Sequence, residues 1–190
     1  MNRLSLRDLQ RMRMVLSHYG PGPHPDGSPQ SVHGGDRSKK TSTSTTGAGF
    51  PVQAADLGSA TARAEFDRSI SVNPKKWAEL SPGTKRFVMA HEIAHHTVEE
   101  YVLKNNPAWD RASDALTMQV KDGRHLFMGG TTRIGEAVSD AVAAYVVGDT
   151  FGREVPGWRD WAGQVIKESG YSKNQLKSWT DAAVKKANDL

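Results

Sequence analysis

The sequence predicts a mostly helical α+β domain. Several segments place apolar residues three or four positions apart between helix-capping residues, as amphipathic helices do. One short segment, residues 66–73, instead shows a period-two pattern that suits a strand. No internal repeat is apparent, and 190 residues suffice for one domain with a proper core but not for two large domains.

Composition limits the class of protein further. A hydrophobic content of 37% is low for a globular chain, which predicts that part of the chain lies outside the core. The net charge of +4 permits an acidic partner without requiring one, so we do not expect nucleic-acid binding. Cysteine is absent, which excludes disulfides and thiolate ligands. No apolar run is long enough for a transmembrane segment or a secretory signal, so we expect a soluble protein.

Residues 1–19 are predicted to form a basic amphipathic helix that begins at Ser5 and ends at Gly20. Such a helix can bind a membrane, an acidic surface or a partner helix, and we favour packing on its own protein or on a neighbour. Residues 20–49 are rich in Pro, Gly, Ser and Thr and are predicted to be a flexible linker. The folded domain is then residues 50–190.

Within the linker, the segment HPDGSPQSVHGG, residues 24–35, resembles a short segment found in head-morphogenesis and related virion proteins of actinobacterial phages. The resemblance implies a phage or prophage origin, with the protein located in the virion or in the host cytoplasm. It implies nothing about chemistry, and we expect His24 and His33 to be solvated rather than metal-bound.

A helix is predicted from Ser81, a favourable N-cap followed by proline, to about Lys104. It contains the pattern H-E-x-x-H at His91, Glu92 and His95, for which chance predicts about 0.01 occurrences in a chain of this composition. On a helix the two histidines lie about 40° apart in projection and one turn apart along the axis, so both can reach one metal ion. Glu92 is placed to hold a water molecule beside that metal.

Two other residues of this helix could be considered as metal ligands, and we expect a different role for each of them. His96 falls on the side opposite the metal and is predicted to be a surface histidine. Glu99 projects on the metal side, and we expect it to be the partner of a nearby cation or of a ligating histidine rather than a ligand.

A second helix, residues 131–147, is apolar around nearly its whole circumference and should be buried. It nevertheless carries Glu136 and Asp140, one turn apart on one face. Buried carboxylates need an electropositive partner, which a metal bound by His91 and His95 would supply. Further helices are predicted over residues 108–120, 158–168 and from Ser172 onwards, and a glycine-rich loop over residues 121–130.

Catalytic zinc takes three protein ligands and leaves one position for water, so the sequence offers His91, His95 and Glu136 as ligands of Zn²⁺. Asp140 is placed to accept the N–H of a ligating histidine. If Glu136 is not the third ligand, Asp114, Glu99 and His125 are the alternatives.

The motifs HEIAH and GEAVSDAVA, in this order, resemble those of the gluzincin metallopeptidases, the thermolysin-like group. The resemblance implies a minimal zincin-like domain, with a short sheet whose edge strand flanks the active-site helix. It also implies that His91, His95 and Glu136 bind zinc, that Glu92 is the general base in peptide hydrolysis, and that Asp140 orients a histidine, His91 in our interpretation.

Two parts of such a site are less sharply specified. A donor usually stabilises the negative charge that develops on the substrate carbonyl oxygen, and His125, Tyr145 and Arg133 are candidates, of which we choose His125. Residues 69–72 are the candidate edge strand for binding a peptide or protein substrate by strand addition. The second hypothesis is a virion structural or assembly protein that keeps a metallopeptidase fold without turnover and docks through its N-terminal helix.

Overall fold

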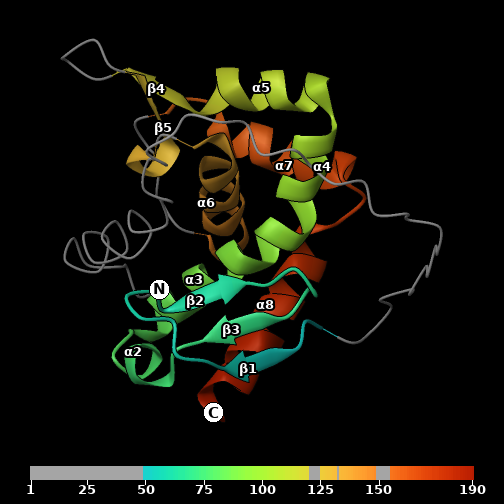
Figure 1. Cartoon of the computed structure of the whole chain (residues 1–190). Coiled ribbons are helices and arrows are strands. Elements are labelled where there is room, and N and C mark those ends of the chain that lie inside the picture. Colours follow the sequence, from blue (N-terminus) through green and yellow to red (C-terminus); the bar gives the residue numbers. More distant parts are fainter. Residues whose placement is uncertain (1–48, 120–124, 132, 149–154) are drawn as a thin grey trace, which may run out of the picture.

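A computed structural model describes residues 49–119, 125–131, 133–148 and 155–190 (Figure 1). The predicted N-terminal helix, residues 1–19, the phage-like segment 24–35 and nearly all of the predicted linker lie outside the described residues. The described part joins a small three-stranded sheet to a larger set of helices, which confirms the predicted α+β, mostly helical class. In Figure 1 the sheet lies at the bottom of the molecule and helix α5 at the top.

The sheet consists of β1 (Val52–Ala54), β2 (Ala62–Ala64) and β3 (Ile70–Val72) in the order β1-β3-β2. β3 runs parallel to β1 and antiparallel to β2. Residues 69–72, predicted to supply an edge strand, therefore supply the central one, and β2 is the edge strand nearest α3 (Figure 1). The cause is burial: all three residues of β3 are at most 2% exposed, as expected of a strand with a neighbour on each side.

The hairpin between β2 and β3 also differs from the prediction. Phe66, placed in the strand by its spacing, is fully exposed in the turn. The Ser69 N–H donates to the Asp67 side chain at 2.9 Å, and Arg68 has a positive φ of 67°. These local hydrogen bonds compete with strand pairing, so β3 begins only at Ile70.

Helices make up most of the remaining described residues. In chain order they are α2 (Pro74–Ala78), α3 (Pro82–Ala94), the π-helical turn η1 (His95–Glu99), α4 (Glu100–Lys104), α5 (Asn106–Leu116), the 3-10 turn η2 (Met128–Gly130), α6 (Ile134–Val147), α7 (Trp158–Glu168) and α8 (Lys173–Asn188). The Ser81 hydroxyl accepts the Thr84 N–H at 3.2 Å, which confirms the predicted start of α3. Gly148, at φ 79°, ends α6 as predicted.

Two predicted elements are shorter than expected. The helix expected to continue to Lys104 is interrupted by η1, and the helix expected over residues 108–120 ends at Leu116. The following residues form β4 (Thr117–Gln119), which pairs antiparallel with β5 (His125–Phe127) inside the predicted loop. Pairing with the next strand in the chain thus overrides local helix propensity after Leu116.

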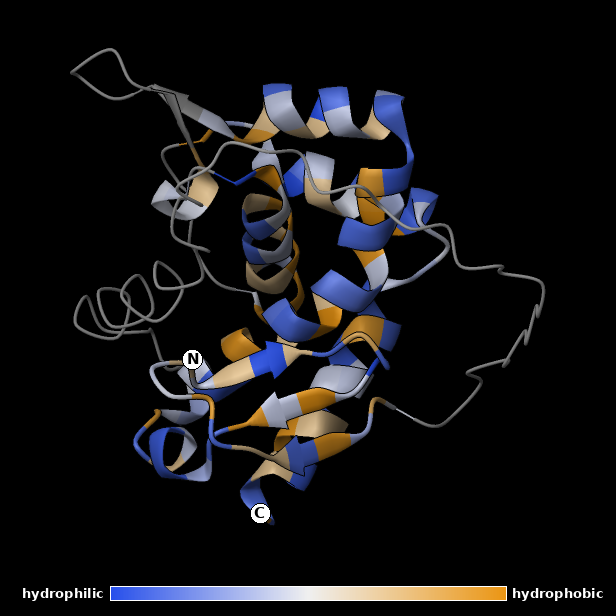
Figure 2. Ribbon diagram, in the orientation of Figure 1, coloured by the Kyte–Doolittle hydropathy of each residue, from blue (hydrophilic) through white to orange (hydrophobic). Residues whose placement is uncertain are grey.

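The core lies around α6, which packs on α3, α5, α7 and α8. Its small residues Ala137, Ala141 and Ala144 are fully buried, and small side chains let neighbouring helices come close. Figure 2 shows hydrophobic residues in β1, β3 and α6, while α5 presents hydrophilic residues to solvent. Trp158 and Trp179 are buried and pack in the hydrophobic core. Within the described ranges, no helix is long and apolar enough to cross a membrane.

The central strand should carry much of the stability of the sheet. Replacing the fully buried Ile70 by Ala removes apolar contacts and leaves a cavity, and we expect the free energy of unfolding to fall by about 2–5 kcal/mol. Leu190→Ala, at a side chain that is 49% exposed, should change it by less than about 0.5 kcal/mol. Urea unfolding followed by circular dichroism measures both, and equal effects would contradict the central position of β3.

Candidate metal centre

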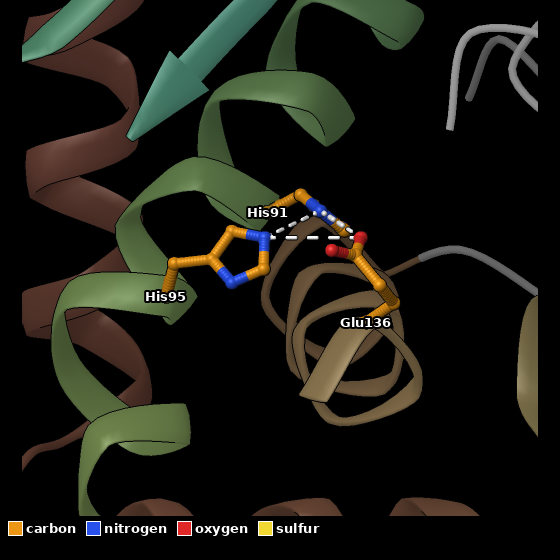
Figure 3. A group of neighbouring side chains, drawn as sticks. All are labelled: His91, His95 and Glu136. Carbon is orange, nitrogen blue, oxygen red and sulfur yellow. Dashed lines mark hydrogen bonds and ion pairs between the residues drawn. The ribbon is translucent and has the colours of Figure 1, made fainter. Parts of the chain in front are cut away.

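The structure brings the three predicted metal ligands together (Figure 3). His91 lies in the last turn of α3, His95 begins η1, and Glu136 lies in the first turn of α6. The two Nε2 atoms are 2.9 Å apart, and Glu136 Oε2 lies 3.3 Å from the first and 3.9 Å from the second. The close packing of α3 and η1 against α6 produces this convergence.

These three donor atoms fit a divalent metal ion. Ligands about 2.0–2.1 Å from a tetrahedral zinc ion are about 3.3 Å from one another, and the three observed separations bracket that value. Two imidazole nitrogens with one carboxylate oxygen suit zinc and other divalent transition metals. Among the described residues, this is the group of His and acidic side chains that could hold such an ion.

Each histidine turns its other nitrogen, Nδ1, toward a carboxylate. His91 Nδ1 lies 2.9 Å from Asp140 Oδ1, so Asp140 contacts His91 as the sequence predicted. His95 Nδ1 hydrogen-bonds Glu99 Oε2, so Glu99 contacts a predicted ligand, one of the two partner types expected for it. An N–H···O⁻ bond at Nδ1 fixes the tautomer in which Nε2 offers its lone pair to the metal.

The carboxylates dominate the electrostatics of the two histidines. Burial by itself lowers the pKa of His91, but the hydrogen bonds to Asp140 and Glu136 outweigh it and raise that pKa well above its usual range. Burial likewise opposes protonation of His95, and the hydrogen bond to Glu99 leaves its pKa raised. Burial by itself raises the pKa of the half-buried Glu136, but its hydrogen bond with His91 outweighs this and leaves that pKa lowered. The pocket thus favours positive charge, the condition that a bound cation satisfies.

Glu92 is buried at 6% exposure and is held by the edge strand. Its Oε2 atom accepts the backbone N–H of Ala64 at 2.7 Å. Because the next residue, Glu65, donates its N–H to Ser69 in the hairpin, the Ala64 N–H points away from β3 and toward α3. The general base predicted from the motif is therefore fixed between the edge strand and the histidine pair. At residues 62–64 the sequence Ala-Arg-Ala is too short for its alternation to predict this strand.

A cavity of about 710 Å³ opens over this centre. Its walls include the metal-binding group, Glu92, and the β2–β3 hairpin with the exposed Phe66. A neighbouring cavity of about 410 Å³ shares Glu99, Arg133 and Glu136 with the first and has apolar walls that include Leu103 and Trp109. The predicted ligands are therefore bordered by open space on the hairpin side as well as on the α4–α5 side.

The remaining predicted site residues have different outcomes. His125 begins β5, and its side chain lies outside what the structure describes. Tyr145 lies at the far end of α6 under the Lys173 ammonium, 4.3 Å from the ring centroid, and is not a wall of either cavity. Arg133, at the N-cap of α6, lines both cavities. Asp114 is exposed on α5, outside the ligand group.

His96 was predicted to be a surface histidine, and this is wrong in part. The ring is half-buried, stacks on Phe50 with 5.4 Å between ring centroids, and its Nε2 lies 3.1 Å from the Ser69 carbonyl oxygen. The helical projection placed it correctly away from the ligands but could not show that the chain before β1 covers that face. His96 thus joins η1 to the hairpin.

Comparisons of the chain with protein-family models, curated proteins and solved structures found no match. Function is therefore inferred from the geometry of the centre and from the two motifs that build it.

Metal binding can be tested directly. We expect the purified protein to bind about one equivalent of zinc, and Glu136→Ala to weaken binding because a ligand is lost. Asp114→Ala removes an exposed carboxylate outside the group and should leave zinc content unchanged. Elemental analysis together with titration calorimetry measures this, and unchanged zinc affinity in Glu136→Ala would show that Glu136 is not a ligand.

Proposed function

We propose that this chain is a zinc-dependent metallopeptidase of the gluzincin type. The observation that carries the proposal is the position of Glu92, whose carboxylate is fixed by the Ala64 N–H next to His91 and His95. A buried carboxylate beside a metal-capable group and an open cavity is what hydrolysis requires of a general base. The gluzincin motifs of the sequence assign the same residue to that role.

His91, His95 and Glu136 would hold the zinc ion, with Asp140 and Glu99 keeping the imidazoles in the ligating tautomer. When bound, zinc supplies a Lewis acid that polarises a carbonyl group and makes a water molecule more acidic. Glu92 accepts a proton from the attacking water and returns it to the leaving nitrogen of the cleaved peptide bond. The hydrogen bond from Ala64 keeps this carboxylate oriented for both transfers.

Arg133 is the candidate for stabilising the negative charge on the substrate oxygen. Among the three residues considered for this role, it is the one whose side chain is described as a wall of the cavity, on the same turn as Glu136. Arg133 is exposed at the wall of the cavity, and a cation there stabilises negative charge that develops on a nearby oxygen.

An extended peptide is the substrate that the edge strand favours. β2 borders the cavity through Arg63 and Ala64, and strand addition to such an edge binds a peptide mainly through its backbone. The exposed Phe66 stands at the end of the same strand and offers apolar contact to side chains of the peptide. The resemblance of the segment 24–35 to virion proteins supports a virion setting for the proposed cleavage.

Glu92→Gln tests the mechanism, because glutamine keeps an acceptor for the Ala64 N–H but cannot take a proton from water. We expect zinc content to be unchanged and the rate of hydrolysis of an unfolded protein substrate to fall by about 10²-fold or more. Glu79→Gln changes an exposed residue outside the cavity and should keep full activity. A chelator should abolish the activity of the wild-type protein and of Glu79→Gln.

Activity that survives in Glu92→Gln would refute Glu92 as the base. A wild-type protein that binds zinc but hydrolyses no peptide in a mixed library would instead support the second hypothesis, a metallopeptidase fold without turnover.

A further inference from the structure

We propose that Glu99 is a positioning residue that presets His95 for the metal, and that Gly135 is required because it makes room for Glu99. This inference rests on the proposed metal centre and adds a second carboxylate to it. Asp140 supports His91 from α6, whereas Glu99 supports His95 from within its own helix.

The first observation is the π-helical turn. η1 begins at His95 and ends at Glu99, so the irregular turn spans the histidine and its partner. Within it the Thr97 hydroxyl donates to the Ile93 carbonyl at 2.8 Å, and Thr97 is buried. Such π-helical turns interrupt α-helices mostly where function requires a side chain to be placed differently. Here the turn brings the Glu99 carboxylate against His95 Nδ1.

The second observation comes from α6. A Cβ atom added to Gly135 would lie on Glu99 Oε1, far inside van der Waals contact. Glycine is otherwise unfavourable in a helix, and Gly135 lacks the positive φ that would explain it. The absence of a side chain at this position is therefore explained by the carboxylate that occupies the space.

The location of Glu99 also explains why its carboxylate is held firmly. One oxygen contacts His95 and the other lies against Gly135 in the first turn of α6, where unpaired backbone N–H groups favour negative charge. The N-cap residue Arg133 makes no side-chain capping bond to this turn. Glu99 thus lies between His95 and the turn that carries Glu136, two of the proposed ligands.

Ser139 is a competing partner that the test must include. Its hydroxyl lies 3.2 Å from the same Nδ1 atom of His95. A charged acceptor forms the stronger bond, so we assign the positioning role to Glu99 and expect Ser139→Ala to have a small effect.

The test measures zinc affinity by competition with a chelator of known affinity, and the visible spectrum of the Co²⁺-loaded protein. Glu99→Ala should weaken zinc binding by about 10- to 100-fold and change the cobalt spectrum, because His95 is no longer oriented. Glu99→Gln should lose less, since its amide oxygen still accepts from Nδ1. Glu100→Ala is the matched control: it removes the neighbouring carboxylate, which pairs with Lys104, and should change zinc affinity by less than about threefold.

A double-mutant cycle tests the role of Gly135. Gly135→Ala should displace the Glu99 side chain rather than unfold the protein, and should weaken zinc binding as Glu99→Ala does. In the Glu99→Ala background the obstacle is gone, so Gly135→Ala should cause no further loss. Thermal unfolding of the metal-free proteins shows whether each variant is folded.

Unchanged zinc affinity and an unchanged cobalt spectrum in Glu99→Ala, or additive effects in the cycle, would overturn the inference while leaving the proposed peptidase intact. Failure of the wild-type protein to bind zinc would overturn both.

Discussion

The placement of one buried and one half-buried carboxylate on an apolar helix is the constraint on which the rest of the structure depends. Glu136 and Asp140 lie on α6, whose surroundings are otherwise almost wholly hydrophobic, and Asp140 is 2% exposed. A buried carboxylate without a partner costs several kcal/mol, so α6 must lie where partners exist. The partner of both is His91 at the end of α3. The packing of α3 against α6 therefore forms the core and the candidate site at once, because it brings apolar and ionic contacts together.

The same constraint explains the arrangement of the layers. α3 contacts α6, α8 and the edge strand β2, so it lies between the helical part and the sheet. The histidines leave this helix on the α6 side and Glu92 reaches the sheet side at Ala64. A single turn of α3 thus supplies both a proposed metal ligand and the proposed base. The edge strand β2 lies beside that turn, and the two elements together wall the cavity.

Local sequence patterns predicted the parts of the site that a single helix determines. The spacing of His91, Glu92 and His95, and of Glu136 and Asp140, follows from helical periodicity, and the unfavourable charge on α6 indicated that the two helices meet. Periodicity could not order the sheet, since strands of three residues, one of them Ala-Arg-Ala, carry too little pattern. It also missed η1, because hydrogen bonds within the turn and contacts with α6 decide between α- and π-helical geometry.

The geometry of the centre suits the proposed catalytic role better than a structural one. Structural zinc sites surround the ion with four protein ligands, and their domains depend on the metal to fold. Here the group among the described residues has three members, and its open side faces a cavity of about 710 Å³. The helices that bear the ligands are joined by a continuous hydrophobic core that includes Phe87, Ile93 and Val138, and by the His91–Asp140 contact. Apolar burial on this scale stabilises the packing of these helices, so the fold has a source of stability other than a bound ion.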